Sequence, residues 1–327
     1  MKLRAFTERW PIADAFVIAR GSKTSADVVV AEFTDGEFVG RGECVPYARF
    51  GQNVDACLEE IAGFAALMRN DQHDIFDELR GAELSSATKN AIDCAFWDFR
   101  CKRDGVQAWD LMGLAVIDSL PLSRTISLGS VNAMADAALG HPEIGLLKIK
   151  LDADDIVAKV AAVHRRRPDA QLIVDANESW SLDQLRSVHE ELADLGVVLI
   201  EQPLRADDDR KLKGFASAVP LCADESMIRY DDIERIAALY DVINLKLDKC
   251  GGLTDALVWM KRADEIGLQT MVGCMVCTSL SIAPAFYLAQ RADFVDLDGA
   301  WLLSGDREHG IRYKNGMMLP PDAVLWG

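Results

Sequence analysis

The chain of 327 residues has no apolar run that approaches the ~20 residues of a membrane-spanning helix, so we expect no membrane segment. Its first residues, MKLRAFTERWPI, mix apolar and charged side chains and do not resemble a signal peptide. Positive charge is also scarce, because the chain has 35 basic and 52 acidic residues and a net charge of −17. Nucleic acids and anionic membranes favour a basic surface, so neither is an expected partner.

Residue types that serve zinc or disulfide chemistry are few. The eight cysteines mostly lie inside apolar patterns such as AIDCAFWDF and VPLCADES, which indicates buried thiols of a cytoplasmic protein. Cys274 and Cys277 form a CxxC pair, but one pair without a second is a weak zinc signal. We assign no catalytic role to the five histidines, which lie away from the predicted strand ends at positions 73, 141, 164, 189 and 309.

What the chain does contain is enough apolar sequence for a large core, since half of its residues are hydrophobic and 27% are charged. Residues 1–115 carry strand patterns first (FVIARG, ADVVVAEFTD, FVGRGECVPY) and the helical pattern SATKNAIDCAFWDFRCKRD afterwards. This order predicts an α+β module that ends near DLMGLAVIDSLPL.

Between residues 116 and 305, short aliphatic runs alternate with helical patterns. The runs start at residues 123, 146, 171, 196, 219, 241, 268 and 292, so successive starts are 22 to 27 residues apart. Eight strands at this spacing predict an α/β fold of the modified TIM type, a (β/α)7β barrel. An open doubly wound sheet has the same alternation, but the near-equal steps and the lack of a glycine-rich phosphate loop favour the barrel. We expect residues 306–327 to pack back on the N-terminal module.

Charged residues recur where these strands end, which is the edge at which a barrel builds its active site. Taken singly, each carboxylate is explained as a helix N-cap and each lysine as a solvated side chain. Three neighbouring strands, however, each end in a carboxylate: Asp175, Glu201 and Asp224. Carboxylates that lie so close together repel one another unless a cation neutralises them. Without His or Cys at these positions, the set predicts a hard ion, Mg²⁺ first, with Mn²⁺ also suitable.

Two lysines at strand ends lie on opposite sides of the predicted barrel, Lys150 on the second strand and Lys246 on the sixth. Neighbouring cations would lower a lysine pKa enough for it to act as a base. Two bases that face each other across a metal-held substrate can remove a proton from one face of a carbon and return it to the other. This geometry predicts an epimerase or racemase that works through an enediolate.

The segment INLKLDKCGG, residues 243–252, contains the second of these lysines. Strand alternation predicts that Asn244, Lys246 and Asp248 share one face, with Asp248 near the rim of the barrel mouth. We expect Gly251 and Gly252 to turn the chain tightly into the next helix.

The motifs KIK, VDAN, EQP, ADES and KLDKCGGL resemble the muconate-lactonizing subgroup of the enolase superfamily, whose Lys or His bases act with Mg²⁺. FVIARGSK, GECVPYARFG, DANESW, GCMVCTS and DLDGAWL are most similar to the L-Ala-D/L-Glu (dipeptide) epimerases. The resemblance covers the N-terminal module, a capping domain in that family, and the barrel. It implies a cytoplasmic, Mg²⁺-dependent epimerase of small dipeptides from peptidoglycan recycling, and a homo-oligomer is compatible with it.

The resemblance also implies a role for each motif residue. Lys150 would serve the R epimer and Lys246 the S epimer, while Asp175, Glu201 and Asp224 would bind Mg²⁺. Substrate contacts would come from Lys148 at the carboxylate, Thr125 on the first strand, and Asp296 and Asp298 at the N-terminal ammonium of the peptide.

One position departs from the family pattern. Members selective for an acidic second residue carry an arginine in the early cap loop, where this chain has Lys23. Lysine keeps the charge but loses the bidentate fork. Arg20 and Arg49 lie nearby and would compensate, and for Arg20 a structural salt bridge is an equal alternative. Two alternative functions are compatible with the same core. One is a cycloisomerase or o-succinylbenzoate synthase, whose substrates lack an α-ammonium. The other is a non-catalytic binding barrel.

Overall fold

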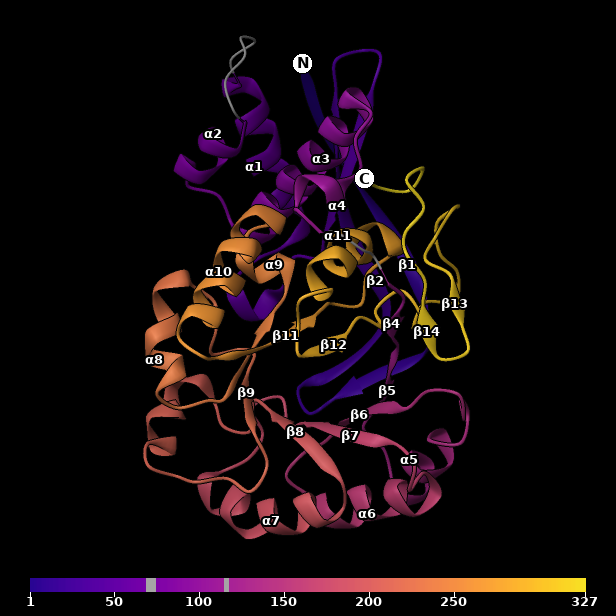
Figure 1. Cartoon of the computed structure of the whole chain (residues 1–327), viewed down its shortest axis with the longest axis vertical. Helices are drawn as coiled ribbons and strands as arrows, with labels where there is room; N and C mark the ends of the chain where they lie inside the picture. Colours follow the sequence, from indigo (N-terminus) through magenta and orange to yellow (C-terminus); the bar gives the residue numbers. More distant parts are fainter. Residues whose placement is uncertain (69–74, 115–117) are drawn as a thin grey trace.

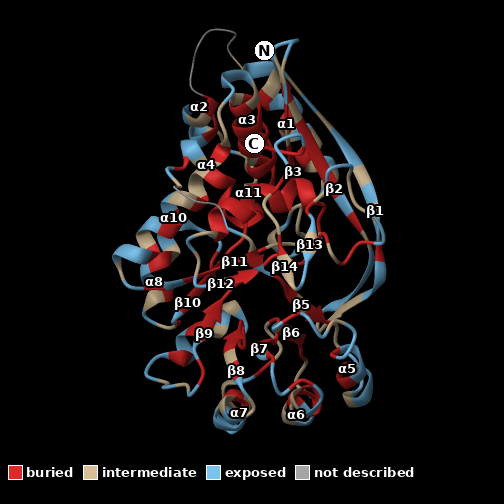
Figure 2. Ribbon diagram, turned by 45° about the vertical axis from the view of Figure 1, so that its right-hand side comes forward, coloured by how far each residue is buried: buried red, intermediate tan, exposed pale blue. Residues whose placement is uncertain are grey.

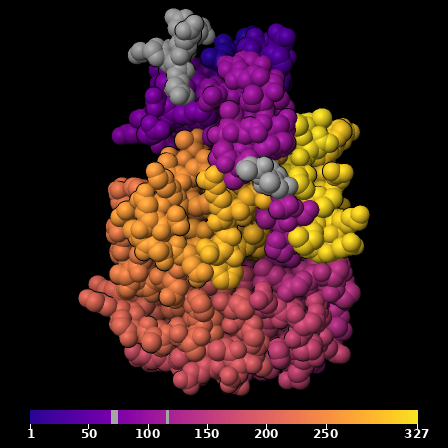
Figure 3. Space-filling model, in the orientation of Figure 1, coloured from indigo at the N-terminus to yellow at the C-terminus, as the bar shows by residue number. Residues whose placement is uncertain are grey.

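The computed structural model describes residues 1–68, 75–114 and 118–327, and it places a cap above a barrel (Figure 1). The predicted boundary between residues 115 and 116 lies outside the described residues, as does His73. In the space-filling view, the C-terminal residues lie along one side and contact both parts (Figure 3).

The cap contains an antiparallel sheet in the order β1-β2-β3. Its strands are Lys2–Ile18, Gly21–Thr34 and Val39–Cys44. Side chains alternate along β2, so that Val29, Ala31 and Phe33 join the apolar cluster of the cap helices. Val28 and Val30 point the other way and belong to the main core of the molecule. Both faces of β2 are therefore buried from Val28 to Ala31.

The helices of the cap are η1 (Ala48–Phe50), α1 (Val54–Leu67), α2 (Ile75–Gly81), α3 (Ser86–Asp104) and α4 (Ala108–Leu111). Helix α3 is the long helix that the sequence predicted, and the Ser85 hydroxyl caps it by accepting from the Thr88 amide at 3.3 Å. Strand β3 crosses α3 at Gly40 and Gly42, where a Cβ atom would lie 2.2 Å from a main-chain oxygen of the helix. Only glycine permits this approach.

The eight predicted barrel strands are all present and run parallel, in sheet order from β12 to β5. They are β5 (Ser123–Ile126), β6 (Leu146–Lys150), β7 (Gln171–Asp175), β8 (Val197–Glu201), β9 (Leu221–Ala223), β10 (Val242–Leu245), β11 (Gln269–Gly273) and β12 (Phe294–Asp296). The first and last strands are linked by side chains, because the Ser123 hydroxyl donates to Asp296 at 2.9 Å and the Thr125 amide donates to Asp298 at 2.7 Å. The predicted barrel is thus confirmed.

Helices on the outside of the barrel connect successive strands (Figures 1 and 2). In chain order they are α5 (Val131–Ala137), α6 (Ile156–Arg166), α7 (Leu182–Asp194), η2 (Ala206–Leu212), η3 with α8 (Tyr230–Asp232 and Ile233–Ala237), α9 with α10 (Leu247–Cys250 and Leu253–Glu265) and α11 (Ser279–Ala289). The connection after β8 is a 3-10 helix rather than an α-helix. None of the described helices is long and apolar enough to cross a membrane.

A small strand group completes the fold, since β4 (Leu120–Pro121) pairs with β14 (Met317–Met318), which pairs with β13 (Tyr313–Lys314). The chain end contacts the cap directly. The Trp326 indole donates to the Cys94 carbonyl at 3.0 Å, and the Gly327 amide donates to Asp98 at 2.8 Å.

The structure corrects the interpretation of residues 243–252. Strand β10 ends at Leu245, and Leu247–Cys250 forms the short helix α9. Asp248 therefore does not lie beside Lys246 at the rim but points to the cap, where it accepts from the Val45 amide at 2.9 Å and from Asn90 at 3.0 Å. The expected glycine turn is present, with φ of 95° at Gly251 and 113° at Gly252.

Candidate active site

A cavity of about 390 Å³ lies between the barrel mouth and the cap loops. The predicted residues among its lining are Lys23, Thr125, Lys148, Lys150, Asp224, Lys246, Asp296 and Asp298. The other two predicted residues, Asp175 and Glu201, are fully buried beside it at the ends of β7 and β8. Strand register explains this grouping, since Lys150, Asp175 and Glu201 are paired across β6, β7 and β8.

Lys148 occupies the centre of the carboxylate group. Its ammonium lies 2.6 Å from Asp296 and 3.4 Å from Asp175, and it also forms an ion pair with Glu201. Burial would lower the pKa of Lys148, but the three carboxylates outweigh burial and raise it. Lys148 is therefore fixed as a cation by protein groups.

Each candidate base is hydrogen bonded to a different carboxylate. Lys150 donates to Asp175 at 2.5 Å, and Lys246 donates to Asp224 at 2.6 Å. Burial would raise the pKa of Asp175, but Lys150 and Lys148 outweigh it and lower the value to about 2. Burial likewise favours neutral Lys246, yet Asp224 and Glu201 raise its pKa. The lowered pKa that the sequence predicted for Lys246 requires a bound cation, because Asp224 and Glu201 act in the opposite direction.

Glu201 lies between a neutral donor and a cation. Its Oε1 accepts from Asn244 at 2.7 Å, and its fully buried Oε2 forms the ion pair with Lys148. Burial and the charges of Asp175 and Asp224 raise the pKa of Glu201 to about 7. The three buried carboxylates form an all-oxygen donor set of the kind that a hard divalent cation prefers.

As they stand, no three His, Cys, Asp or Glu side chains of the described residues are placed to hold a metal ion together. Lysine ammonium groups lie against oxygens of Asp175 and Asp224 instead. The donor chemistry thus fits the predicted ion, while the geometry is that of carboxylates paired with lysines.

Two further carboxylates line the cavity at the C-terminal end of β12. Asp296 accepts from Lys148 and from Ser123, and Asp298 accepts from the Thr125 amide. Burial would raise the pKa of Asp296, but Lys148 lowers it, whereas burial and Asp296 raise the pKa of Asp298 to about 6. Two acidic side chains at this wall favour a cationic group of a ligand.

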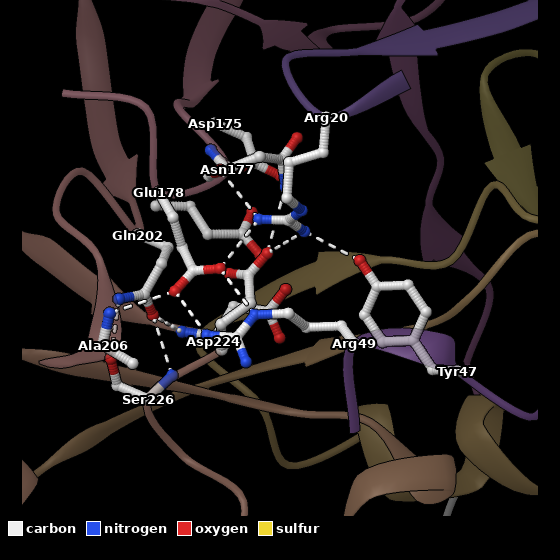
Figure 4. A network of polar contacts seen from close by, with 12 residues as sticks. Arg20, Tyr47, Arg49, Asp175, Asn177, Glu178, Gln202, Ala206, Asp224 and Ser226 are labelled. Atoms are coloured by element: carbon white, nitrogen blue, oxygen red, sulfur yellow. Dashed lines mark hydrogen bonds and ion pairs between the residues drawn. The ribbon is translucent and has the colours of Figure 1, made fainter. Parts of the chain in front are cut away.

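The cap loops contribute a second polar network, drawn in Figure 4. Arg20 donates to Glu225 at 2.5 Å, to the Tyr47 hydroxyl at 2.7 Å and to Glu178 at 3.1 Å. Arg49 forms two hydrogen bonds of 2.9 Å with Glu178. Both arginines are thereby committed to barrel carboxylates. Both also line the cavity, so their compensation for the missing cap-loop arginine stays a prediction, while the ion pairs of Arg20 match the structural salt bridge that the sequence also allowed.

Lys23 lies on β2 at the cavity, with its ammonium 5.7 Å from the centre of the Tyr47 ring. It forms no ion pair with any other described residue of the chain. Lys23 is therefore the cap cation that remains available to a ligand.

The sequence missed several residues that the structure brings to the site. Lys249 donates to Asp224, Asn244 donates to Glu201, and Ser123 donates to Asp296. Glu178 joins two cap arginines to the end of β7. The signal for Lys249 was its spacing of three residues from Lys246, which becomes informative only once α9 is known to be helical.

The cysteines behave as predicted for buried thiols, since all eight are free and only Cys274 is partly exposed. The Cys274 thiol contacts the Asp296 carbonyl at 3.5 Å. It is thus a wall residue of the cavity rather than part of a zinc site.

Two family models match the chain. Residues 1–113 match the mandelate racemase / muconate lactonizing enzyme N-terminal domain, and residues 131–324 match the enolase C-terminal domain-like family. The L-Ala-D/L-Glu epimerase of Escherichia coli K12 is 38% identical over 316 residues, 96% of this chain and 98% of the relative. The N-acetyl-D-glutamate racemase of Pseudoalteromonas is 39% identical over 300 residues, 92% and 95% of the two chains.

Solved structures agree with these relatives. An enolase family member from Agrobacterium tumefaciens, described as homologous to dipeptide epimerases and bound to sodium and L-Ala-L-Glu, is 40% identical, with a TM-score of 0.96 and 99% coverage of both chains. The dipeptide epimerase of Enterococcus faecalis, complexed with Mg and L-Leu-L-Tyr, is 27% identical, with a TM-score of 0.92 and coverage of 99% and 98%. The chain belongs to the mandelate racemase / muconate lactonizing enzyme family of the enolase superfamily.

Proposed function

We propose that this protein is a Mg²⁺-dependent dipeptide epimerase that inverts the α-carbon of the second residue, with L-Ala-D/L-Glu as its substrate. The observation that carries the proposal is the placement of Lys150 and Lys246, each at the end of a barrel strand, lining one cavity and hydrogen bonded to separate buried carboxylates.

In the proposed reaction, Lys246 takes the α-proton from the S epimer and Lys150 supplies a proton to the opposite face. The reverse reaction exchanges these roles. Lys148 holds the substrate carboxylate as a fixed cation, because its own charge is maintained by three carboxylates. Asp296 and Asp298, with Thr125 beside them, form the wall that takes the peptide ammonium.

Asp175, Glu201 and Asp224 would hold the Mg²⁺ ion, with Mn²⁺ as a substitute. When bound, the ion would stabilise the negative charge that develops on the substrate carboxylate as the α-proton leaves. The burial of all three carboxylates at the ends of neighbouring strands supports this assignment.

Glutamate as the second residue is supported by two observations. Lys23 is a cavity cation without an ion-pair partner in the described chain, and a lone ammonium suits a side-chain carboxylate. In addition, both relatives described above carry glutamate in their names. We further propose a cytoplasmic location and a role in peptidoglycan recycling, as the resemblance implies.

A second candidate is racemisation of N-acetylglutamate, which is favoured by the name of one relative at 39% identity. The two substrates share the glutamate carbon and differ at the amino group, which is an ammonium in one and an amide in the other. The Asp296 and Asp298 wall favours the ammonium.

A competition of substrates tests the assignment. We expect kcat/KM for L-Ala-L-Glu to exceed that for N-acetyl-L-glutamate, and chelation of Mg²⁺ to abolish both activities. Asp298→Asn should reduce the dipeptide reaction and spare the acyl substrate, whereas Asp296→Asn should reduce both because Asp296 also pairs with Lys148. Equal loss for both substrates in Asp298→Asn would exclude the ammonium role of Asp298. Turnover of a muconate or of the o-succinylbenzoate precursor alone would exclude the epimerase.

A further inference from the structure

Lys249 is a buried lysine to which the proposed reaction gives no role. It lies in α9, three residues after Lys246, and its side chain is 1% exposed. Its ammonium donates to Asp224 twice, to Oδ1 at 2.6 Å and to the main-chain carbonyl at 2.7 Å. A buried charge with two hydrogen bonds to one residue holds that residue firmly in place.

Asp224 consequently has one lysine on each carboxylate oxygen, Lys249 on Oδ1 and Lys246 on Oδ2. The two lysines are not equivalent. Lys246 makes a single hydrogen bond to Asp224 and is 10% exposed, which is consistent with contact to a ligand. Lys249 makes two, and lies deeper.

The backbone that carries Lys249 is fixed on both sides. Asp248 is bonded to the cap through Val45 and Asn90. After α9, a Cβ atom at Gly252 would lie 2.5 Å from the Asp93 side chain, so the turn is packed tightly against α3. Lys249 therefore has little freedom to leave Asp224.

The other candidate base has the same arrangement. Lys150 donates to Asp175, and Asp175 has a second lysine, Lys148, at 3.4 Å. A spacing of two residues places Lys148 and Lys150 on one face of β6. A spacing of three residues across the junction of β10 and α9 achieves the same for Lys246 and Lys249. Each base thus shares its carboxylate with a second lysine whose side chain is more deeply buried than its own.

Lys249 thus restrains the Asp224 carboxylate at Oδ1 and the Asp224 main chain at its carbonyl. We propose that Lys249 is a positioning residue that holds the Asp224 carboxylate in the orientation in which it would bind the metal ion and contact Lys246. This inference rests on the proposed function, in which Asp224 is a metal ligand and Lys246 a base.

The test compares Lys249→Met and Lys249→Arg with Lys261→Met, a change at an exposed lysine of α10. Titration calorimetry on metal-free protein should show Mg²⁺ affinity lowered about 10- to 100-fold in Lys249→Met, the range typical of groups that orient metal ligands. Lys249→Arg should recover part of the loss, and Lys261→Met should match the wild type.

Exchange in D₂O gives a second readout. Lys249→Met should slow α-deuterium uptake from the L epimer, the substrate of Lys246, more than uptake from the D epimer. Wild-type Mg²⁺ affinity in both Lys249 variants, or equal slowing of both epimers, would overturn the inference while leaving the epimerase intact. Wild-type protein that binds no Mg²⁺ and exchanges no α-proton would overturn the proposed function, and this inference with it. If Lys249→Met does not fold, Lys249→Arg and Lys249→Gln decide the outcome by the same two measurements.

Discussion

At the scale of single residues, the site is defined by which charges are already paired. Arg20 and Arg49 line the cavity but are already paired with Glu178 and Glu225. Lys23 lines the same cavity without a carboxylate partner among the described residues. The sequence does not show which of these three cations is paired with a carboxylate, because all three lie in the predicted cap loops.

Removal of either base should separate the two halves of the reaction. Lys246→Ala should lower epimerisation by about 10²–10⁴-fold, as expected for loss of a general base, and leave α-deuterium exchange from the D epimer measurable. Lys150→Ala should do the reverse. Normal epimerisation by either variant, followed by circular dichroism of the product, would exclude the two-base mechanism.

Lys23 should set the preference for an acidic second residue. Lys23→Met is expected to lower kcat/KM for L-Ala-L-Glu about 10- to 100-fold, corresponding to the ~1.5–3 kcal/mol of a hydrogen bond to a charged group. The same change should leave L-Ala-L-Val unaffected, and Lys23→Arg should retain the glutamate preference. A similar loss for both dipeptides would show that Lys23 maintains the cap instead.

At the scale of elements, the strands and helices of the barrel were predictable because their patterns are regular. All eight strands were correctly placed, since each is an aliphatic run bounded by turn residues. The prediction was wrong after Leu245, where alternation of Leu247 and Asp248 continues by chance into α9. A helix of four residues is too short for a 3.6-residue period to emerge, so Asp248 was assigned to the wrong partner and Lys249 was overlooked.

Glu178 joins both cap loops to β7, and it was not predictable because its partners are 158 and 129 residues away in the sequence. Glu178→Gln keeps the shape of the side chain but removes the charge that holds Arg20 and Arg49. We expect KM to rise about 10-fold with a smaller change in kcat, as for the loss of a charged hydrogen bond. Hydrogen exchange should accelerate in residues 18–23 and 47–52.

The matched control is Glu8→Gln, which weakens the ion pair with Arg307 at another contact of the cap. It should change neither KM nor exchange in those two loops. If Glu178→Gln behaves like Glu8→Gln, the network in Figure 4 does not hold the loops closed.

At the scale of the whole molecule, cap and barrel share buried carboxyl groups. Asp93 on α3 accepts from the Thr254 amide at 3.0 Å and so caps α10 of the barrel. Burial raises the pKa of Asp93 to about 7, and burial likewise raises the pKa of Asp248 to about 7. The cap and the barrel therefore contact each other through two carboxyl groups whose raised pKa values favour the protonated form.

This gives a pH dependence of stability with a definite sign. A carboxyl whose pKa is higher in the folded state binds protons preferentially there, so its stabilising contribution is complete below about pH 4 and is lost as the pH rises to about 7. Asp93→Asn should remove this pH-dependent loss of stability. The variant should exceed the wild type in urea midpoint at pH 8 and converge with it near pH 4, whereas the exposed control Asp14→Asn should follow the wild type. A midpoint difference that is constant with pH would contradict the assignment.

In the proposed reaction, two lysines exchange one α-proton of the substrate with solvent. Wild-type protein incubated with L-Ala-L-Glu and Mg²⁺ in D₂O, and followed by NMR, tests it most directly. We expect L-Ala-D-Glu to accumulate with deuterium at the α-carbon of its glutamate, and the remaining L epimer to acquire deuterium as well. The absence of α-deuterium from L-Ala-L-Glu and from every other dipeptide tested would contradict the account.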